Sequence, residues 1–467
     1  MNKRRQTLVY VLSDFTTAAF VWLLLNMLRY AEVAQYDGFE TLALYLASSQ
    51  VLKGQLLIPF FWLTLYYFSG YYNIPFGKSR IGELFGTLVC VAIGVTVIFF
   101  AVLLNDLPRS FEIYLRIFFA YTAMQFFLTY AVRFSITLHA LRKMRRREWA
   151  PNVLVIGAGQ QALQTKKDLT KLGYRIAGFV GIDAATAPAI PQDEVLGSVD
   201  DLPQLMTACP VDELVLAPDA IPDAEIIRIL YSLYHYSLPI KVRMEKNNPL
   251  ARGKVKIIHG IPFIEVTANN FSEAGKNIKH ALDKVVAVLV LTLLSPMYAC
   301  IAFRVKKSSP GPVFFSQERI GYMGRPFTIY KFRTMYADAG NRQGALLTER
   351  DDPRVTPFGR FLRKYRLDEF PQFWNVLKGD MSLVGPRPEQ RYYIDRIVSR
   401  APCYYLLHNV RPGITSWGMV KYGYADTVEK MIERLDYDIM YYENMSLSLD
   451  LTILAYTIKI VLTGKGV

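Results

Sequence analysis

Cysteine and histidine are scarce in this chain of 467 residues, and neither is grouped. The sequence has 4 cysteines and 5 histidines. The cysteines, at positions 90, 209, 300 and 403, lack the close paired spacing of a zinc site and the density of a disulfide scaffold. The histidines form no cluster. These absences exclude a small disulfide-rich protein and a Cys/His metal centre.

Acidic residues are also in the minority. Lys and Arg number 54 against 40 Asp and Glu, which gives a formal net charge of +14. A basic chain is typical of nucleic-acid binding, but here the cations cluster beside apolar runs and around candidate phosphate motifs. We therefore expect no nucleic acid as a partner, and we expect contacts with membrane lipid.

Long apolar runs occupy the first third of the chain, and 52% of all residues are hydrophobic. The runs lie at 8–28, 56–72, 84–104 and 117–138, each near the roughly 20 residues that a bilayer core requires. They predict a four-helix transmembrane bundle over residues 1–143.

The flanking cations predict how this bundle is oriented. Basic residues precede the first run, lie between the second and third at Lys78 and Arg80, and follow the fourth at 142–147. By the positive-inside rule, all these segments face the cytoplasm. Asp14 lies inside the first run, and we expect its carboxylate to reach the cytoplasmic interface.

A change of pattern follows the basic linker. The apolar stretch 153–156 leads into a glycine turn at Gly157 and Gly159 and then into a helical pattern, which predicts an α/β Rossmann-like cytoplasmic domain over 144–262. The two glycines are candidate nucleotide-binding residues, because they allow a pyrophosphate to approach a helix N-terminus. The acid expected after the second strand is only loosely matched by Asp183, which favours a regulatory or assembly module.

The apolar run 285–303 carries Ser295 and Pro296 near its middle. Proline removes a helical hydrogen bond and bends the helix. Basic residues flank both ends of the run, so both ends are predicted to be cytoplasmic. A re-entrant helix broken at Ser295 and Pro296 satisfies both observations; the alternative is a fifth span with a proline kink.

Two adjacent acids, Asp368 and Glu369, stand near several conspicuous cations. Adjacent acids usually form a solvated helix face. Here Arg387 follows within a Gly-Pro-Arg-Pro sequence, where two prolines preset it to present a bidentate fork to phosphate. The alternatives are a turn arginine in solvent and basic residues that attract anionic lipid headgroups. Further candidate phosphate-binding cations are Arg319, Lys331, Arg333 and Arg363.

Asp450 lies in a C-terminal apolar run, 447–462. The run is short for a bilayer and is interrupted by Asp450 and Lys459, which predicts an interfacial or packed amphipathic helix. A lone acid among apolar residues needs a partner or a role.

Several separated motifs occur in the order typical of one family. They are Ser295-Pro296, Pro-Gly-Pro-Val-Phe-Phe at 310–315, Lys-Phe-Arg at 331–333, Leu-Asp-Glu at 367–369, Gly-Pro-Arg-Pro at 385–388 and Arg-Pro-Gly-Ile-Thr at 411–415. On these motifs the segment from about 279 to 467 resembles the bacterial sugar transferases, which are monotopic polyprenyl-phosphate phosphoglycosyltransferases. The whole chain resembles their long form, the undecaprenyl-phosphate hexose-1-phosphate transferases.

The resemblance implies a two-step transfer of a sugar phosphate from a UDP-sugar to undecaprenyl phosphate with release of UMP. Asp368 matches the family's nucleophile and Glu369 the neighbouring acid that holds Mg²⁺, so both acids are candidate metal ligands. Asp450 matches another acid of the family's site. The product would start a lipid-linked exopolysaccharide, capsule or O-antigen.

One departure and two rival interpretations remain open. Many family members continue after 415 with Gly-Trp-Ala-Gln-Val-Asn-Gly, where this chain has Ser-Trp-Gly-Met-Val-Lys-Tyr. Glucose, galactose and an acetamido sugar therefore stay open. A membrane-bound nucleotide-sugar dehydratase is disfavoured, because no tyrosine lies four residues before a lysine. A membrane scaffold that senses nucleotide through 157–162 survives only if Asp368 is dispensable.

Together these patterns predict a multidomain membrane protein. We expect the four-helix bundle at 1–143, the Rossmann-like domain at 144–262, and an α/β catalytic domain anchored by the re-entrant helix at 263–467. Both ends of the bundle and the two α/β domains are expected on the cytoplasmic side of a bacterial inner membrane. We also expect the chain to form a homo-oligomer.

Overall fold

A computed structural model of the chain describes residues 3–34, 38–76, 78, 80–102, 110–146, 148–182, 189–219, 221–236, 238–243, 254–258, 261–265, 269, 271–336, 352–423 and 425–464. The chain separates into two compact units. The first comprises Met1–Pro151, Leu169–Arg175 and Ser272–Ile278, and the second comprises Asn152–Asp168, Ile176–Phe271 and Lys279–Val467. The predicted domain limits at 143 and 262 stay predictions.

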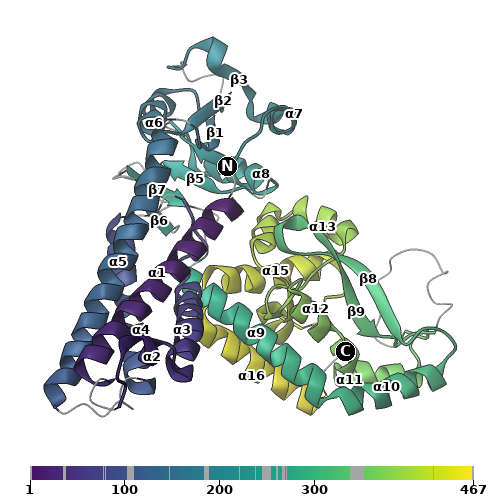
Figure 1. Ribbon diagram of the computed structural model, residues 1–467. Coiled ribbons are helices and arrows are strands. Elements are labelled where there is room, and N and C mark those ends of the chain that lie inside the picture. The colour runs from purple at the N-terminus through teal and green to yellow at the C-terminus, as the bar shows by residue number, and fades with distance from the viewer. Residues whose placement is uncertain are drawn as a thin grey trace. The chain divides into compact units, whose positions relative to one another are not determined.

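The first unit is an antiparallel arrangement of long helices (Figure 1). Its helices are α1 (Lys3–Glu32), α2 (Leu42–Leu46), α3 (Ser49–Phe68), α4 (Arg80–Ala101) and α5 (Phe111–Arg145). All except the short α2 are long and apolar enough to cross a membrane. The prediction of four apolar helices is thereby confirmed, and the chain is a membrane protein.

A polar network lies inside this helical unit. Arg133 donates from Nε and Nη2 to the two carboxylate oxygens of Asp14 at 2.9 and 2.7 Å, and the Tyr72 hydroxyl donates to the same carboxylate at 2.8 Å. Asp14 is 2% exposed and Arg133 is 1% exposed. The expectation that Asp14 reaches an interface is wrong, because an ion pair with Arg133 balances its charge in the interior.

The first turn of α9 (Glu273–Leu293) also belongs to this unit. Asn73, which follows α3, donates from its side-chain amide to the Glu273 carboxylate at 2.8 Å. The Asn277 amide donates to the backbone carbonyl of Tyr67 at 2.6 Å. These polar contacts fix the start of α9 against the α3–α4 connection.

The second unit begins with a seven-stranded sheet in the order β3-β2-β1-β4-β5-β7-β6. The β2–β3, β1–β4 and β4–β5 pairs are parallel, whereas β7 pairs antiparallel with β5 and β6. Strand β1 is almost wholly buried, as expected for an apolar strand with parallel neighbours. The elements are β1 (Asn152–Ile156), α6 (Gln160–Lys171), β2 (Arg175–Gly181), β3 (Val195–Ser198), α7 (Leu202–Ala208), β4 (Glu213–Leu216), α8 (Asp223–Tyr234), β5 (Ile240–Arg243), β6 (Lys254–Ile258) and β7 (Ile261–Glu265).

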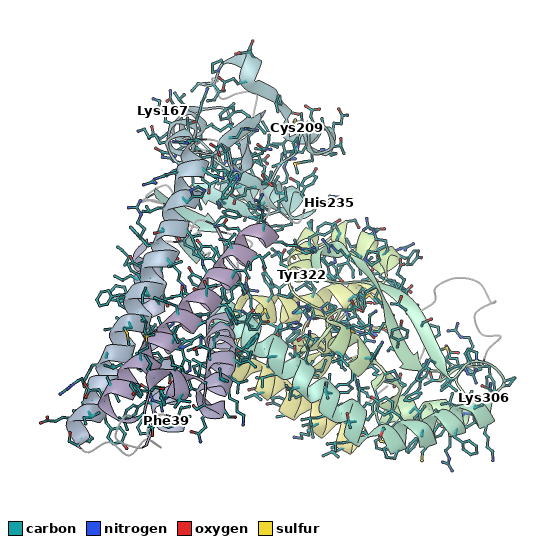
Figure 2. All side chains as sticks on the ribbon, viewed as in Figure 1. Phe39, Lys167, Cys209, His235, Lys306 and Tyr322 are labelled. Atoms are coloured by element: carbon teal, nitrogen blue, oxygen red, sulfur yellow. The ribbon has the colours of Figure 1, made fainter. Side chains whose placement is uncertain are left out.

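The chain then bends sharply at the predicted break. Helix α9 and helix α10 (Ser295–Ser308) meet at an angle of 64°. Pro296 lies in the first turn of α10, where its missing N–H has no helical partner to lose, and the Ser295 hydroxyl donates to the carbonyl of Thr292 at 2.8 Å. Lys306 lies near the end of α10 (Figure 2).

The remaining part of the second unit contains a long antiparallel hairpin, β8–β9, whose strand β8 is largely exposed (Figure 1). A second, parallel pair joins β10 to β11. The elements are β8 (Phe314–Ile320), β9 (Pro326–Phe332), α11 (Pro357–Lys364), η7 (Leu367–Glu369), α12 (Gln372–Lys378), β10 (Ser382–Val384), α13 (Arg391–Val398), η8 (Pro402–Asn409), β11 (Gly413–Thr415), α14 (Trp417–Lys421), α15 (Val428–Glu443) and α16 (Leu447–Thr463).

Candidate functional site

Asp368 and Glu369 lie on η7, a single turn that follows α11. The chain enters this turn through Arg366, whose φ of 53° and ψ of 24° are left-handed. Both acids are 8% exposed, so they are not a solvated helix face. The turn instead holds two carboxylates side by side in a largely buried position.

Glu369 is surrounded by cations. The Lys331 ammonium donates to its Oε1 at 2.7 Å, and Arg387 Nη1 lies 3.6 Å from the same oxygen. Arg366 Nη1 lies 3.7 Å from Oε2. Burial alone would raise the pKa of Glu369, but the charges of Lys331, Arg387 and Arg366 outweigh it and hold the pKa well below its usual range.

Asp368 has a different environment, although it is the next residue. Among the described residues, no hydrogen bond or ion pair engages its carboxylate. Burial raises its pKa, the charge of Lys331 lowers it, and the neighbouring Glu369 raises it again, with a net rise. The turn therefore presents one carboxylate neutralised by cations and one with free oxygens.

Arg387 is held by the backbone around it. It follows β10, and the carbonyl of Pro386 accepts from the Gly413 N–H at 2.9 Å, which ties its loop to β11. A Cβ at Gly385 would overlap the carbonyl of Arg411, so only glycine allows this close approach. The guanidinium is 20% exposed and lies 3.2 Å from Met419 Sδ.

Residues 274–464 match the family described as bacterial sugar transferase, and residues 67–242 match the family described as CoA-binding domain. A UDP-glucose:undecaprenyl-phosphate glucose-1-phosphate transferase of Xanthomonas campestris pv. campestris is 32% identical, over 67% of this chain and 67% of that protein. The chain belongs to the bacterial sugar transferase family.

Other members of the family align over different lengths. A UDP-N-acetylgalactosamine-undecaprenyl-phosphate N-acetylgalactosaminephosphotransferase of Aeromonas hydrophila is 46% identical over 40% of this chain, which spans 44% of that protein. An undecaprenyl-phosphate galactose phosphotransferase of Salmonella typhimurium is 28% identical over 88% of this chain and 86% of its own length. A glucose-1-phosphate transferase of Escherichia coli is spanned over 65% of its length.

Two further predicted phosphate-binding cations of this sugar transferase contact other residues of the second unit and not the two acids of the turn. Arg319 donates from Nη1 to the Pro388 carbonyl at 3.2 Å and to Glu389 at 3.1 Å, directly after the loop that carries Arg387. Arg363 donates from Nε to the Thr334 hydroxyl at 2.9 Å. Neither forms a hydrogen bond with Asp368 or Glu369 within the described ranges.

Arg333 and Asp450 are engaged elsewhere. Arg333 Nη2 donates to the carbonyl of Ser309 at 2.7 Å, and the side chain is buried. Asp450 accepts from Lys279 Nζ at 2.6 Å and from the Tyr441 hydroxyl at 2.7 Å. Asp450 thus has the partner that a buried acid needs, and it ties α16 to α9.

Arg366, Glu389 and Arg434 belong to this region, but sequence reasoning did not select them. Arg434 Nη2 donates to Glu389 at 2.7 Å, and the two side chains are 6% and 5% exposed. Glu389 directly follows Pro388, and Arg366 lies two residues before Asp368. Glu389 and Arg366 could have been selected from the sequence, because each lies beside a recognised motif.

The glycine turn between β1 and α6, a candidate phosphate site, is closed by an acidic side chain. The Asp219 carboxylate accepts the backbone N–H of Gln161 at 3.0 Å, and a Cβ at Gly159 would overlap that carboxylate. Gly157 has a φ of +128° and lies against the carbonyl of Ala217. An internal acid thus occupies the helix N-terminus, and the turn does not fit the pyrophosphate of CoA or of a dinucleotide. Asp183 lies outside the described residues.

The side chains that could bind Mg²⁺ are the two acids of η7. Among the described residues, no group of three or more His, Cys, Asp or Glu side chains is arranged to hold a metal. Mg²⁺ commonly takes only one or two carboxylates and completes its shell with water and substrate phosphates. Asp368 and Glu369 fit that requirement in type and number, with Asp368 having both oxygens free.

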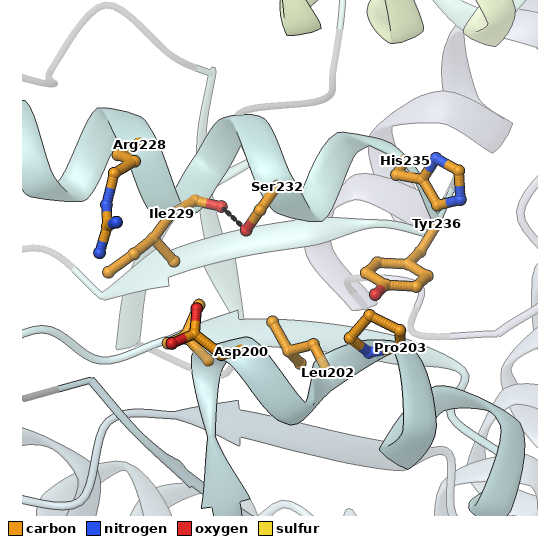
Figure 3. A pocket seen from close by; sticks show the side chains of 9 residues that line it. Asp200, Leu202, Pro203, Arg228, Ile229, Ser232, His235 and Tyr236 are labelled. Atoms are coloured by element: carbon orange, nitrogen blue, oxygen red, sulfur yellow. Dashed lines mark hydrogen bonds between the residues drawn. The ribbon is translucent and has the colours of Figure 1, made fainter. Parts of the chain in front are cut away.

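A separate hollow lies beside the large sheet, between α8 and the chain leading into α7 (Figure 3). In it the Ser232 hydroxyl donates to the carbonyl of Ile229 at 2.7 Å. The lining residues include none of the cations or acids of the Asp368 turn. They are Val199, Asp200, Leu202, Pro203, Arg228, Ile229, Ser232, His235 and Tyr236.

Proposed function

We propose that this chain is a phosphoglycosyltransferase that moves a sugar 1-phosphate from a UDP-sugar to undecaprenyl phosphate. The observation that carries the proposal is the division of roles on η7. Glu369 is neutralised by cations, while the adjacent Asp368 carboxylate has no hydrogen-bond or ion-pair partner in the described part of the chain. Membership in the bacterial sugar transferase family supports the reaction class, because relatives are named for this transfer.

In the first step an ionised Asp368 oxygen attacks the β-phosphorus of the UDP-sugar. A new P–O bond forms to Asp368, the bond from that phosphorus to the bridging oxygen breaks, and UMP leaves with the bridging oxygen and its electron pair. The product on the enzyme is an aspartyl phosphosugar. A carboxylate with free oxygens meets the first requirement of such a nucleophile.

In the second step an oxygen of undecaprenyl phosphate attacks the same phosphorus. The P–O bond to Asp368 breaks, the carboxylate is regenerated, and the product is undecaprenyl diphosphate-sugar. Each step moves a negatively charged phosphoryl group, so fixed cations that stabilise charge in the transition state accelerate both. Lys331 and Arg387 flank Glu369, and we assign them to this task together with Arg319 and Arg363 as supporting cations.

Asp368 and Glu369 would hold Mg²⁺, which would neutralise phosphate charge when bound. Glu369 also orders Lys331 and Arg387 beside Asp368. Arg319 supports Arg387 indirectly, because it binds the Pro388 carbonyl and Glu389 behind the same loop. Asp450 anchors α16 to α9 through Lys279.

The same proposal assigns the membrane arrangement. We infer that the bent α9–α10 pair enters and leaves the membrane on one side, because basic residues flank both of its ends. The Asp368 turn then faces the cytoplasm of a bacterium at its inner membrane, where it meets UDP-sugars. The strand order β3-β2-β1-β4-β5 supports a Rossmann-like middle domain, to which we assign assembly, including self-association of the chain, and no chemistry.

The test is UMP release from a panel of UDP-sugars by the full-length chain with Mg²⁺ and undecaprenyl phosphate. Wild-type release with one sugar, and none with Asp368→Asn, supports the proposal and names the sugar. Equal release from both chains would remove Asp368 as nucleophile. Silence from the wild type across the panel would favour a membrane scaffold instead. Glu443→Gln, at the exposed last residue of α15, is the matched carboxyl-to-amide control.

A further inference from the structure

Arg366 is an arginine in a backbone conformation that favours glycine. It lies two residues after Lys364, the last residue of α11, at the position where helices commonly end in a left-handed residue. Its φ is 53°, and among the described residues outside glycine only Met323, with a φ of 58°, shares a positive value. A long side chain is strained there, and retained strain of this kind clusters at functional sites.

The guanidinium of Arg366 is also short of partners. Its side chain is 18% exposed, yet no hydrogen bond to it is found among the described residues. The polar contact of its guanidinium that the described residues provide is the ion pair with Glu369 at 3.7 Å, which is longer than a hydrogen bond. No Arg366 nitrogen is among the fully buried side-chain atoms that lack a partner, so the donors without a protein acceptor are open to solvent and can be reached by a ligand.

The charges of the residues around Arg366 indicate that an anion would bind beside it. Glu369 accepts a hydrogen bond from Lys331 and lies close to Arg387. Its single negative charge is therefore already balanced by two cations, without Arg366. With Asp368 and Glu369 both ionised, Lys331, Arg387 and Arg366 leave a surplus of positive charge around the turn. Mutually repelling cations are held together most favourably when a further anion lies between them.

Resting on the proposed function, we infer that Arg366 is a phosphate-binding residue that takes the diphosphate of the UDP-sugar together with Arg387. Its guanidinium lies on the side of the turn that carries Glu369, with Nη1 3.7 Å from Glu369 Oε2. The planar guanidinium then offers paired donors to phosphate oxygens. Lysine at this position supplies charge but not the fork.

The test separates the side chain from the backbone. Arg366→Gly removes the guanidinium and relieves the strain, while Arg366→Asn removes it with a residue that tolerates left-handed backbone. Met323→Gly is the matched control for relief of strain, and Arg360→Gln, on an exposed position of α11, is the control for loss of one charge. Binding of UDP and of inorganic pyrophosphate to the full-length chain is measured first, and then KM for the UDP-sugar and for undecaprenyl phosphate.

We expect both Arg366 variants to weaken UDP and pyrophosphate binding and to raise KM for the UDP-sugar by about tenfold or more, as for loss of charged hydrogen bonds. Arg366→Lys should recover part of this loss, and KM for undecaprenyl phosphate and both controls should stay at wild-type values. Wild-type UDP binding by Arg366→Gly would overturn the inference, as would a fall in kcat with unchanged KM. If wild type turns over no UDP-sugar, the proposed function fails, and the UDP and pyrophosphate affinities still decide the role of Arg366.

Discussion

Replacing Glu389 with glutamine should destabilise the second unit strongly. The substitution keeps the side-chain shape and removes a charge that is 5% exposed and holds Arg434 at 2.7 Å and Arg319 at 3.1 Å. Removing one partner of a buried ion pair costs about 3–5 kcal/mol, because the other charge stays buried. At roughly 2–4 °C per kcal/mol for a domain of about 150–250 residues, the unfolding midpoint should fall by about 6–20 °C.

The chain contains a matched control for this prediction. Arg400 and Glu429 form an ion pair at 2.6 Å, nearly the same length, but their side chains are 59% and 62% exposed. Solvated pairs contribute little to stability, so Glu429→Gln should leave the midpoint unchanged. The assay is thermal unfolding of the detergent-solubilised full-length chain at pH 7, followed by intrinsic fluorescence. Equal midpoints for the Glu389 and Glu429 variants would refute the reasoning that burial decides the difference.

The pH dependence of the same comparison has a defined sign. Burial alone would raise the pKa of Glu389, but Arg434 and Arg319 lower it below its usual range. A carboxylate with a lowered pKa in the folded state stabilises the fold fully above its unfolded pKa of about 4.3. That stabilisation is lost as the pH falls through the folded pKa. The gap between wild type and Glu389→Gln should therefore be full at pH 7 and narrow in acid.

Three further predictions follow from other parts of the molecule. UMP release should rise with pH through a midpoint above the ordinary aspartate pKa of about 3.9, because the pKa of Asp368 is raised, and Lys331→Met should move that midpoint higher; a pH-independent rate from pH 4 to 8 would contradict this. Arg133→Gln leaves Asp14 buried without its counter-charge at a cost of about 3–5 kcal/mol. The amount of folded protein that elutes from size-exclusion chromatography should therefore fall, and it should recover in the double variant that also carries Asp14→Asn. Removing Mg²⁺ with EDTA should abolish UMP release, and adding Mg²⁺ back should restore it; full activity in EDTA would exclude the metal.

Much of the architecture could be predicted because long-range packing was not needed to see it. The four apolar runs follow from composition alone, and the bend between α9 and α10 follows from the backbone chemistry of Pro296. The buried environment of Asp14 could not be predicted from the residues around it in the sequence. Its partner Arg133 lies 119 residues away, and only the packing of α1 against α5 brings the two charges together.

Within the site, the motifs identified residue types better than they identified contacts. Lys331 and Arg387 meet at Glu369, but Arg333 binds backbone carbonyls, although it lies only two residues from Lys331. Alternate residues on an extended strand point the same way, and Arg333 follows the end of β9, where that regularity stops. Arg366 escaped notice because a left-handed arginine has no sequence signature.

The adjacent acids of η7 show how one turn can give two carboxylates different chemistry. They share the same burial, and burial by itself raises both pKa values. The difference is the placement of cations, which approach both oxygens of Glu369 and leave the Asp368 carboxylate without an ion pair or hydrogen bond among the described residues. Divergent pKa values in neighbouring groups indicate divided roles. In the mechanism that we propose, Glu369 gathers the cations that bind the diphosphate, and Asp368 keeps a free oxygen beside them for nucleophilic attack.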